Sequence, residues 1–446
     1  MAKLPLEGIR VIGLAVVWSG PYACRLLGDW GAEVIRLESR QHFQYHTRGY
    51  SPRPPQALIE NTVGYSSYKK QGYDPRTAHN AFAIFNGYAA NSLSMTANLR
   101  APEGMDILKR LVQVSDVLIE NNSPTVRETL GLTWDLVREW NPRLIMVSMP
   151  GFGDTGPYRY YRAFGVQMDA FVGHGYMRCY LDEDYDTQSI VFHADEAAGV
   201  SAALAVMMAL YQRLNTGRGQ LIDLGQAETS LCQLGQAVMD YTMNGRITEK
   251  SGNRDYHGAL QGCYRCRNVR GKWAAGVEYV DSWVNVTITN DEEWAGFGRA
   301  TGLDWTRDDR FASTLGRYRH HDELDKLIES WTMTHDSYEV MHSLQREGVP
   351  AGPVMDEKDA CNDTHLRARG FFGEMTHQVC GTHFYPGRPW KISGTPNHLR
   401  LPPCCLGEHN EYVYKQVLGV SDEEYEELKR KGHIGTDYAP EVVGEE

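Results

Sequence analysis

The chain has 446 residues, a hydrophobic fraction of 42% and a formal net charge of −12 at pH 7. This length supports two or three domains with a large buried core, and the composition is that of a globular protein without long disordered tracts. The 57 Asp and Glu residues outnumber the 45 Lys and Arg residues, which excludes a general nucleic-acid-binding surface, because such a surface needs clustered positive charge.

The sequence predicts a soluble, cytoplasmic protein. No uninterrupted apolar run reaches the ~18 residues that a membrane helix needs, and the N-terminus lacks the apolar core of a signal peptide. The cysteines follow no framework spacing, which is typical of reduced thiols in a cytosol. We therefore expect neither a membrane nor a nucleic acid among the partners of this chain.

The first fifty residues predict a strand, a helix and a second strand. Residues 9–14 are an apolar run of strand length, and Ser19-Gly20-Pro21 follows, where Ser can cap a helix and Pro fits the first turn. Apolar residues then recur at helical spacing until Gly31, and residues 32–38 predict the next strand. Such a unit is typical of parallel strands joined by a right-handed crossover.

The rest of the chain continues this pattern after a long polar excursion. Residues 40–90 are rich in Tyr, Gln, Arg and Pro and predict a surface segment. Residues 195–214 predict a helix so rich in small and apolar residues that we expect it to be buried. Other helices and strands are expected at residues 102–114, 116–120, 133–140, 144–148 and 221–224. The alternation predicts an α/β domain.

After residue 245 the composition changes. We expect a polar linker, then a strand pair near residues 262–268 and 273–280, and a helical region from about 290 to 345. The lone pair Cys263 and Cys266 has no second pair at metal-ligand spacing, so we expect free thiols and no metal. The Gly-x-Gly-x-x-Gly fingerprint does not follow the first strand, which argues against an NAD site.

Asp195 is the most distinctive acid, because it lies at the start of the apolar helix. One interpretation is an N-cap, which stabilises a helix by about 1 kcal/mol. The other is a partly desolvated nucleophile that helix amides hold ionised. Spacing alone favours the cap.

Several short motifs then give a family resemblance. They occur in a fixed order at residues 6–11, 19–21, 30–38, 116–121, 130–132, 141–145, 151–157, 216–224, 348–354 and 406–409. Together they resemble the family III CoA-transferases, which include formyl-CoA transferase, the carnitine-pathway CoA-transferase and the bile-acid-inducible protein. The resemblance spans about residues 4–430.

The resemblance implies an enzyme that moves CoA reversibly from an acyl-CoA, with succinyl-CoA as the first candidate, to a carboxylic acid. Asp195, in the pattern Asp-x-x-x-Gly that ends at Gly199, would form an aspartyl anhydride and then an aspartyl-CoA thioester. The CoA thioester is a substrate, and no cofactor is permanently bound. The expected CoA contacts are Val17, Trp18, Ser19, Arg36, Ser39, Arg40, Asn98, Leu99, Arg100, Asn121, Asn122, Ser123 and Arg127.

The same resemblance implies a Rossmann-like large domain, a smaller α+β domain and an intertwined dimer, formed either by two copies or with a related subunit. The expected boundaries are residues 1–245 for the first segment of the large domain, 246–354 for the linkers and small domain, and 355–446 for the C-terminal segment that returns to the large domain.

Departures from the family pattern leave two alternatives open. Cations expected near the CoA phosphates are absent around Ser92, Ser123 and Thr129, and Trp18 replaces a Gln. A first alternative is therefore a CoA-poor, non-catalytic subunit of a heteromeric transferase. A second is an acyl-CoA racemase or isomerase of the same fold, which is disfavoured because the expected Gly-His-Asp is missing from residues 162–168.

Overall fold

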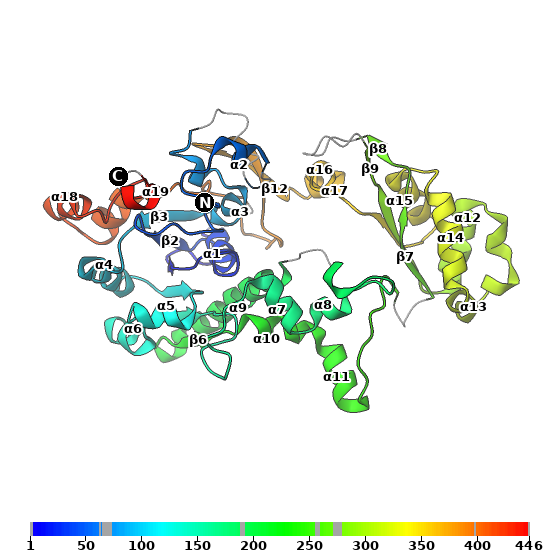
Figure 1. The fold of residues 1–446 in the computed structure, drawn as a ribbon, viewed down its shortest axis with the longest axis horizontal. Helices are drawn as coiled ribbons and strands as arrows, with labels where there is room; N and C mark the ends of the chain where they lie inside the picture. Colours follow the sequence, from blue (N-terminus) through cyan, green and yellow to red (C-terminus); the bar gives the residue numbers. More distant parts are fainter. Residues whose placement is uncertain are drawn as a thin grey trace. The chain divides into compact units, whose positions relative to one another are not determined.

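The structure is a computed structural model that describes residues 3–61, 64, 74–187, 192–254, 259–270, 279–396 and 398–444. The chain divides into two compact units (Figure 1). Unit 1 comprises residues 1–175, 189–246 and 364–446, and unit 2 comprises residues 176–188 and 247–363. The division expected from the sequence differs in two places, since it gave residues 176–188 to the large domain and ended the small domain at 354.

Unit 1 is built on a six-stranded sheet whose neighbouring strands are all parallel. The strand order is β3-β2-β1-β4-β5-β6, as in a dinucleotide-binding Rossmann fold, so the predicted α/β class is confirmed. The strands are β1 (Arg10–Gly13), β2 (Glu33–Glu38), β3 (Ser92–Thr96), β4 (Val117–Glu120), β5 (Ile145–Ser148) and β6 (Leu221–Asp223).

Helices and one further hairpin complete unit 1. The helices are α1 (Ser19–Asp29), α2 (Gln56–Asn61), α3 (Ala83–Ala89), α4 (Pro102–Gln113), α5 (Pro124–Thr129), α6 (Trp134–Trp140), α7 (Gly165–Phe171), α9 (His193–Thr216), α10 (Gln226–Leu231), α11 (Gly235–Asn244), α17 (Thr364–Ala368), α18 (Asp422–Arg430) and α19 (Pro440–Val443). The hairpin pairs β12 (Phe372–His377) with β13 (Gly381–Pro386). The short helix α8 (His174–Met177) leads from unit 1 into unit 2.

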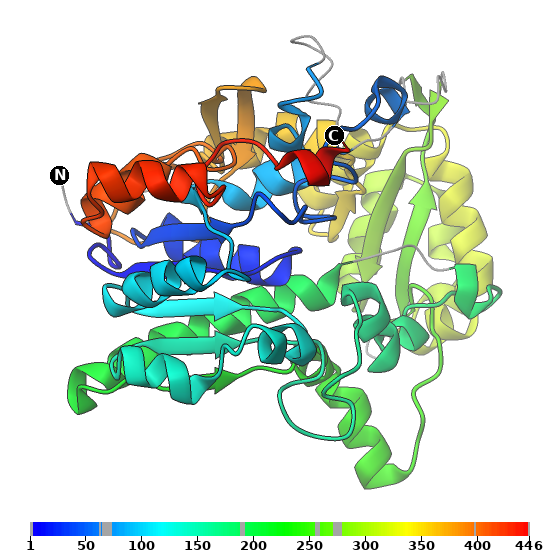
Figure 2. The same cartoon turned by 60° about the vertical axis from the view of Figure 1, so that its left-hand side comes forward.

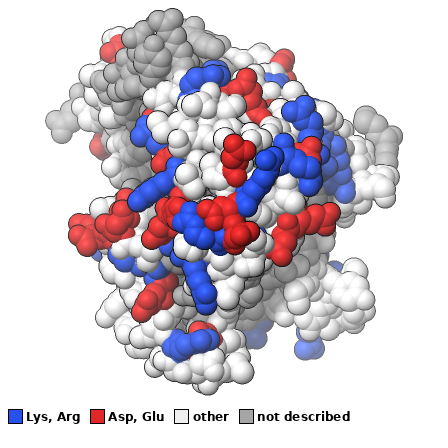
Figure 3. Space-filling model, turned by 90° about the vertical axis from the view of Figure 1, so that its right-hand side faces the viewer, with Lys and Arg blue, Asp and Glu red and all other residues white. Residues whose placement is uncertain are grey.

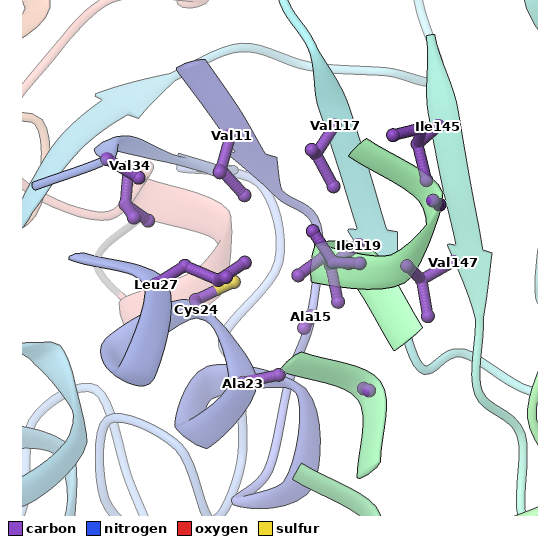
Figure 4. Close-up of a cluster of buried hydrophobic side chains, with 14 of the residues drawn as sticks. Val11, Ala15, Ala23, Cys24, Leu27, Val34, Val117, Ile119, Ile145 and Val147 are labelled. Carbon is purple, nitrogen blue, oxygen red and sulfur yellow. The ribbon is translucent and has the colours of Figure 1, made fainter. Parts of the chain in front are cut away.

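One face of the sheet packs against α1 and α9. Strand residues such as Val11, Val117 and Ile145 are fully buried there, and Ala23 and Leu27 of α1 point into the same cluster (Figure 4). Small residues of α9, including Ala198 and Ala202, join this cluster. Parallel strands covered on both faces need continuous apolar runs, which explains why these strands were visible in the sequence.

The other face packs against α4 and the returning C-terminal segment, which lies beside the N-terminal strands in Figure 2. The segment also explains why β3 was not predicted. Ser94 of β3 accepts the Gly407 N–H with its hydroxyl, and the Thr96 N–H donates to the Asn410 side chain. These polar partners come from more than 300 residues away in sequence. The strand therefore has only two apolar residues, Leu93 and Met95, and lacks the continuous apolar run of a typical buried parallel strand.

Helix α9 is longer and less buried than expected. It is apolar and long enough to pass for a membrane span by length and composition, but it packs against α1 and β5 in the core of unit 1. The expectation of complete burial is wrong for its outer face, because Leu204, Met208 and Leu214 are 61%, 66% and 82% exposed. Composition alone does not distinguish an apolar face packed within its own chain from one left exposed.

Unit 2 contains an antiparallel sheet of order β11-β10-β7. Strand β7 (Leu260–Arg265) pairs with β10 (Trp283–Ile288), a strand that the sequence did not predict, and β11 is Ala351–Pro353. Of the expected second strand, residues 273–278 lie outside the described residues. The short strands β8 (Val269–Arg270) and β9 (Tyr279–Val280) also pair. The helices are α12 (Asp291–Thr301), α13 (Thr314–Arg319), α14 (His321–Thr332), α15 (Ser337–Arg346) and α16 (Glu357–Asn362).

Charged side chains of both signs are interspersed on the face drawn in Figure 3. Ion pairs of unit 2 have this character, for example Arg254 with Asp322 and Asp325, and Arg310 with Glu323. Neighbouring opposite charges cancel one another's field at short range.

Candidate functional site

Asp195 is the third residue of α9 and lies where the starts of α1 and α7 meet that helix. Its side chain is buried, with 6% of the residue exposed. The backbone N–H groups of Gly165, the first residue of α7, and Ser19, the first residue of α1, stabilise its charged form. Amides in the first turn of a helix have no partner within that helix, so they are available to a carboxylate.

Two glycines permit this arrangement. A Cβ on Gly165 would lie 2.0 Å from Oδ2 of Asp195, so a side chain there would displace the carboxylate. A Cβ on Gly199 would lie 2.9 Å from the carbonyl oxygen of Ser19, so only glycine lets α1 approach α9 this closely. The spacing Asp-x-x-x-Gly therefore has a physical meaning, because one turn after Asp195 the helix leaves room for the chain that faces it.

The N-cap interpretation of Asp195 is wrong. The N-cap residue of α9 is Phe192, which makes no side-chain capping hydrogen bond, and Asp195 is the third residue of the helix. The acceptor at this helix start is instead Asp169 of α7, whose Oδ2 accepts the Ala194 N–H at 3.4 Å. Oδ1 of the same Asp169 lies 3.2 Å from Nδ1 of His174. The Asp195 carboxylate therefore does not cap the helix.

Burial, together with the nearby carboxylates of Glu196 and Asp169, raises the pKa of Asp195 to about 7. The amides of Gly165 and Ser19 act in the opposite direction. Above neutral pH the group is therefore an ionised carboxylate with little water around it. Such a carboxylate is a stronger nucleophile than one in bulk water, because attack does not require removal of a hydration shell.

The aromatic side chains of Tyr88 and Trp18 lie near Asp195, and the sequence did not predict Tyr88 at this site. The Tyr88 hydroxyl donates to Glu196, and the Tyr88 ring lies 6.3 Å from that of Trp18. Burial and Glu196 raise the pKa of Tyr88, so this phenol stays protonated. Tyr88 lies in the polar excursion at residues 40–90, where one tyrosine among many gives no signal of a role.

The loop after β1 has an unusual backbone conformation. Val17 and Trp18 have φ angles of 49° and 42°, which are costly for a β-branched and a bulky residue. Asn121 at the end of β4 holds the loop, because its Oδ1 accepts the Val16 N–H at 2.8 Å and its amide donates to the Val17 carbonyl at 3.1 Å. The hydroxyl of Thr47 accepts the Val17 N–H at 2.8 Å. This bracing orients the start of α1 toward Asp195.

Most of the expected CoA contacts follow the carboxyl ends of four adjacent strands, which meet at one edge of the sheet. This is the edge where open parallel sheets bind ligands, and the loops after β1 and β4 meet at the point where the strand order reverses. By strand, they are Val17, Trp18 and Ser19 after β1; Ser39 and Arg40 after β2; Asn98, Leu99 and Arg100 after β3; and Asn121, Asn122, Ser123 and Arg127 after β4.

The four arginines of that set have different surroundings. Arg127 binds Asp154 through both terminal nitrogens, at 2.8 and 2.6 Å, and also contacts Glu120 at 3.2 Å. Arg40 donates to the carbonyl of Asp437 at 2.7 Å. Arg100 is exposed, whereas Arg36, within β2, is 1% exposed. Arg127 and Arg40 are thus already bound by other groups of the same chain.

The described residues contain no group of three or more His, Cys, Asp and Glu side chains that could hold a metal ion. Cys263 lies on β7 and Cys266 just beyond it, and both are free thiols.

Comparisons with known proteins identify the family of this chain. Residues 6–410 match the model of CoA-transferase family III. The chain is 29% identical to succinyl-CoA–D-citramalate CoA-transferase of Chloroflexus aurantiacus over 96% of this chain and 97% of that protein. It is 30% identical to formyl-CoA:oxalate CoA-transferase of Streptomyces coelicolor over 97% of this chain and all of that protein.

Among solved structures, a CAIB/BAIF family protein from Brucella suis is 26% identical and superposes with a TM-score of 0.77, covering 94% of this chain and 100% of that one. The residues that match the family model, 6–410, contain Asp195. The chain belongs to CoA-transferase family III and is an enzyme of that family.

Proposed function

We propose that this protein transfers CoA from an acyl-CoA to a carboxylic acid with Asp195 as the nucleophile. The observation that supports this most is the buried Asp195 carboxylate, which faces the backbone amides of Gly165 and Ser19 and has a pKa of about 7. The named relatives use succinyl-CoA or formyl-CoA and match nearly the whole chain. Succinyl-CoA is the donor that we propose first.

The reaction begins when an Asp195 oxygen attacks the thioester carbonyl of the donor. The C–S bond breaks, CoA leaves as a thiolate, and a mixed anhydride joins Asp195 to the acyl group. The thiolate then attacks the aspartyl carbonyl, which releases the donor acid with one aspartate oxygen and leaves an aspartyl-CoA thioester. The acceptor acid repeats these steps in reverse. Each step exchanges one activated acyl group for another, so no energy source is needed.

The amides of Gly165 and Ser19 supply the electrostatic stabilisation. Negative charge develops on the carbonyl oxygen under attack in each step, and backbone N–H groups fixed in a dry site stabilise that charge without reorganising. The neighbouring Glu196 does not compete as a nucleophile in this scheme, because its carboxylate accepts the Tyr88 hydroxyl. CoA would lie along the sheet edge formed by the residues after β1, β2, β3 and β4.

We also propose that the protein works as a dimer. Apolar side chains are exposed along α9 and α11, including Leu204, Tyr211 and Leu214 of α9 and Met239 and Met243 of α11. An exposed apolar surface of this kind favours burial against another chain. Related proteins include an alpha and a beta subunit of succinyl-CoA–L-malate CoA-transferase, so the partner is either a second copy or a related subunit. All nine cysteines are free, which fits a reducing cytoplasm.

The racemase alternative has less support. The stretch from Arg162 to Met168 lacks the Gly-His-Asp that a racemase of this fold needs. It contains no His, and its Gln167 accepts the Phe164 N–H at 2.9 Å. This stretch therefore supplies no imidazole for proton transfer at carbon.

Mass spectrometry of the intact chain tests the proposal. Incubation with succinyl-CoA should add CoA covalently, and the adduct should map to the peptide of residues 179–213, which contains Asp195. Asp195→Ala should form no adduct, whereas the matched variant Glu196→Gln should keep it. Absence of an adduct with succinyl-CoA, formyl-CoA and longer acyl-CoAs would overturn the proposal and favour a non-catalytic subunit.

A further inference from the structure

Arg36 lines a small, partly open cavity in unit 1. Its wall also includes Trp18, Thr47, Phe85 and Tyr88. Arg36 is only 1% exposed, and its guanidinium carbon lies 5.1 Å from the centre of the Phe85 ring. The wall is otherwise mostly apolar, so the positive charge dominates the interior.

The Arg36 guanidinium has no hydrogen-bond partner among the residues that the structure describes, and its Nε is fully enclosed. Other buried arginines are paired: Arg25 binds Asp29 and two backbone carbonyls, and Arg48 binds Glu38 through two nitrogens, at 2.6 and 2.7 Å. Leaving a buried charge unpaired is costly, and the face of Phe85 does not accept the N–H groups in the plane of the guanidinium.

The carboxylate of Glu38 does not neutralise the charge of Arg36. Glu38, two residues along β2, has its two oxygens bound by Arg48, and one of them also accepts the Ser94 hydroxyl at 2.7 Å. Two buried guanidinium groups therefore share one carboxylate. The local charge is balanced when an anion enters the cavity.

The cavity lies beside the reacting carboxylate. Trp18 precedes Ser19, whose N–H faces Asp195, and Tyr88 donates to Glu196, the residue after Asp195. Both Trp18 and Tyr88 line the cavity. The cavity is small and partly open, so a carboxylate group can enter it from the open side, whereas the adenosine diphosphate portion of CoA is too large for it. Arg36 is thus poorly placed for the phosphate contact expected from the sequence.

We propose that Arg36 binds the second carboxylate of a dicarboxylic substrate while the first carboxylate, or the thioester carbon, reacts at Asp195. A planar guanidinium with free N–H groups matches a carboxylate in a bidentate pair. The inference rests on the proposed function and narrows its substrates to short dicarboxylic acids and their CoA half-thioesters. Succinyl-CoA has this form, with one free carboxylate beyond the thioester.

The test compares succinyl-CoA with butyryl-CoA, which has the same number of carbons and no second carboxylate. The measured quantity is the rate of CoA-adduct formation on Asp195, for the wild type, Arg36→Met, Arg36→Lys and the exposed control Lys109→Met. Loss of a charge-assisted pair should slow the reaction with succinyl-CoA about 10- to 100-fold in Arg36→Met, with little change for butyryl-CoA. Arg36→Lys should lie between, and the control should match the wild type.

Several results would overturn the assignment. An unchanged preference for succinyl-CoA in Arg36→Met would do so, and an equal loss for both thioesters would instead place Arg36 on CoA itself. If Arg36→Met does not fold, Arg36→Lys must show the reduced preference.

If the wild type forms no adduct with either thioester, the proposed function fails. The Arg36 site is then decided by melting temperature: succinate must stabilise the wild type more than butyrate does, and Arg36→Lys must weaken that difference.

Discussion

Replacing Asp195 with Asn should make the protein more stable at neutral and alkaline pH. The folded chain raises the pKa of this carboxyl from 3.8 to about 7, chiefly through burial. Between these values the folded state keeps a proton that the unfolded chain has lost. The stabilising effect of the protonated form is therefore complete below pH 4 and is lost as the pH rises to about 7.

The size of this effect follows from the same values. The difference between 3.8 and about 7 corresponds to a cost on the order of 4 kcal/mol in the free energy of unfolding once both states are ionised. Asn has the same shape, keeps an oxygen for the amides of Gly165 and Ser19, and has no charge. Asp195→Asn should thus escape most of that cost at pH 8 and resemble the wild type at pH 4.

Differential scanning calorimetry between pH 4 and 8 measures this directly. The melting temperature of Asp195→Asn should exceed that of the wild type by an amount that grows with pH and levels off above 7. Glu139→Gln, which removes an exposed carboxylate from α6, is the matched control and should show no such trend. A variant that is destabilised equally at every pH would refute the assigned burial and charge of this site.

Three further predictions concern the same unit. Gly165→Ala should abolish CoA-adduct formation, since its Cβ would lie 2.0 Å from Oδ2 of Asp195; wild-type adduct rates in this variant would contradict the placement of the two groups. The rate of adduct formation should rise with pH and level off with a midpoint near 7, because the nucleophile is the ionised form of Asp195, and a flat profile from pH 5 to 9 would exclude that pKa. Leu214→Lys should lower the molar mass of the purified protein, measured by light scattering, from that of a dimer toward that of a monomer, because the leucine is 82% exposed on α9. The control Lys109→Met on α4 should remain a dimer. A dimeric Leu214→Lys variant would argue against this face as the interface.

The parts of the fold that the sequence predicted are those with local signals. The apolar run at residues 9–14 and the Ser-Gly-Pro turn after it predict β1 and α1, although Ser19 proves to be the first helical residue and not the cap. Strand β3 has no continuous apolar run, and its Ser94 accepts a hydrogen bond from the C-terminal segment. Pairings of this kind depend on residues far apart in the chain, which periodicity does not reveal.

In the candidate site, too, some residues have a local signal in the sequence and others do not. Asp195 was identifiable through its helix and the spacing to Gly199, but its role was not, since the alternative of a cap depended on where Asp169 lies. Gly165, Tyr88 and Asp169 reach Asp195 only through tertiary packing. The sequence shows Arg36 only as a cation. The structure shows that it has no hydrogen-bond partner among the described residues.

The central claim is that an oxygen of Asp195 takes part in bond exchange. The measurement is incubation of the enzyme with succinyl-CoA and succinate labelled with ¹⁸O in both carboxylates, followed by mass analysis of the peptide of residues 179–213. In the proposed mechanism each incoming succinate leaves one of its oxygens on Asp195, so this peptide should gain ¹⁸O at that residue. Exchange of label between succinate and succinyl-CoA with no ¹⁸O in the peptide would contradict the account.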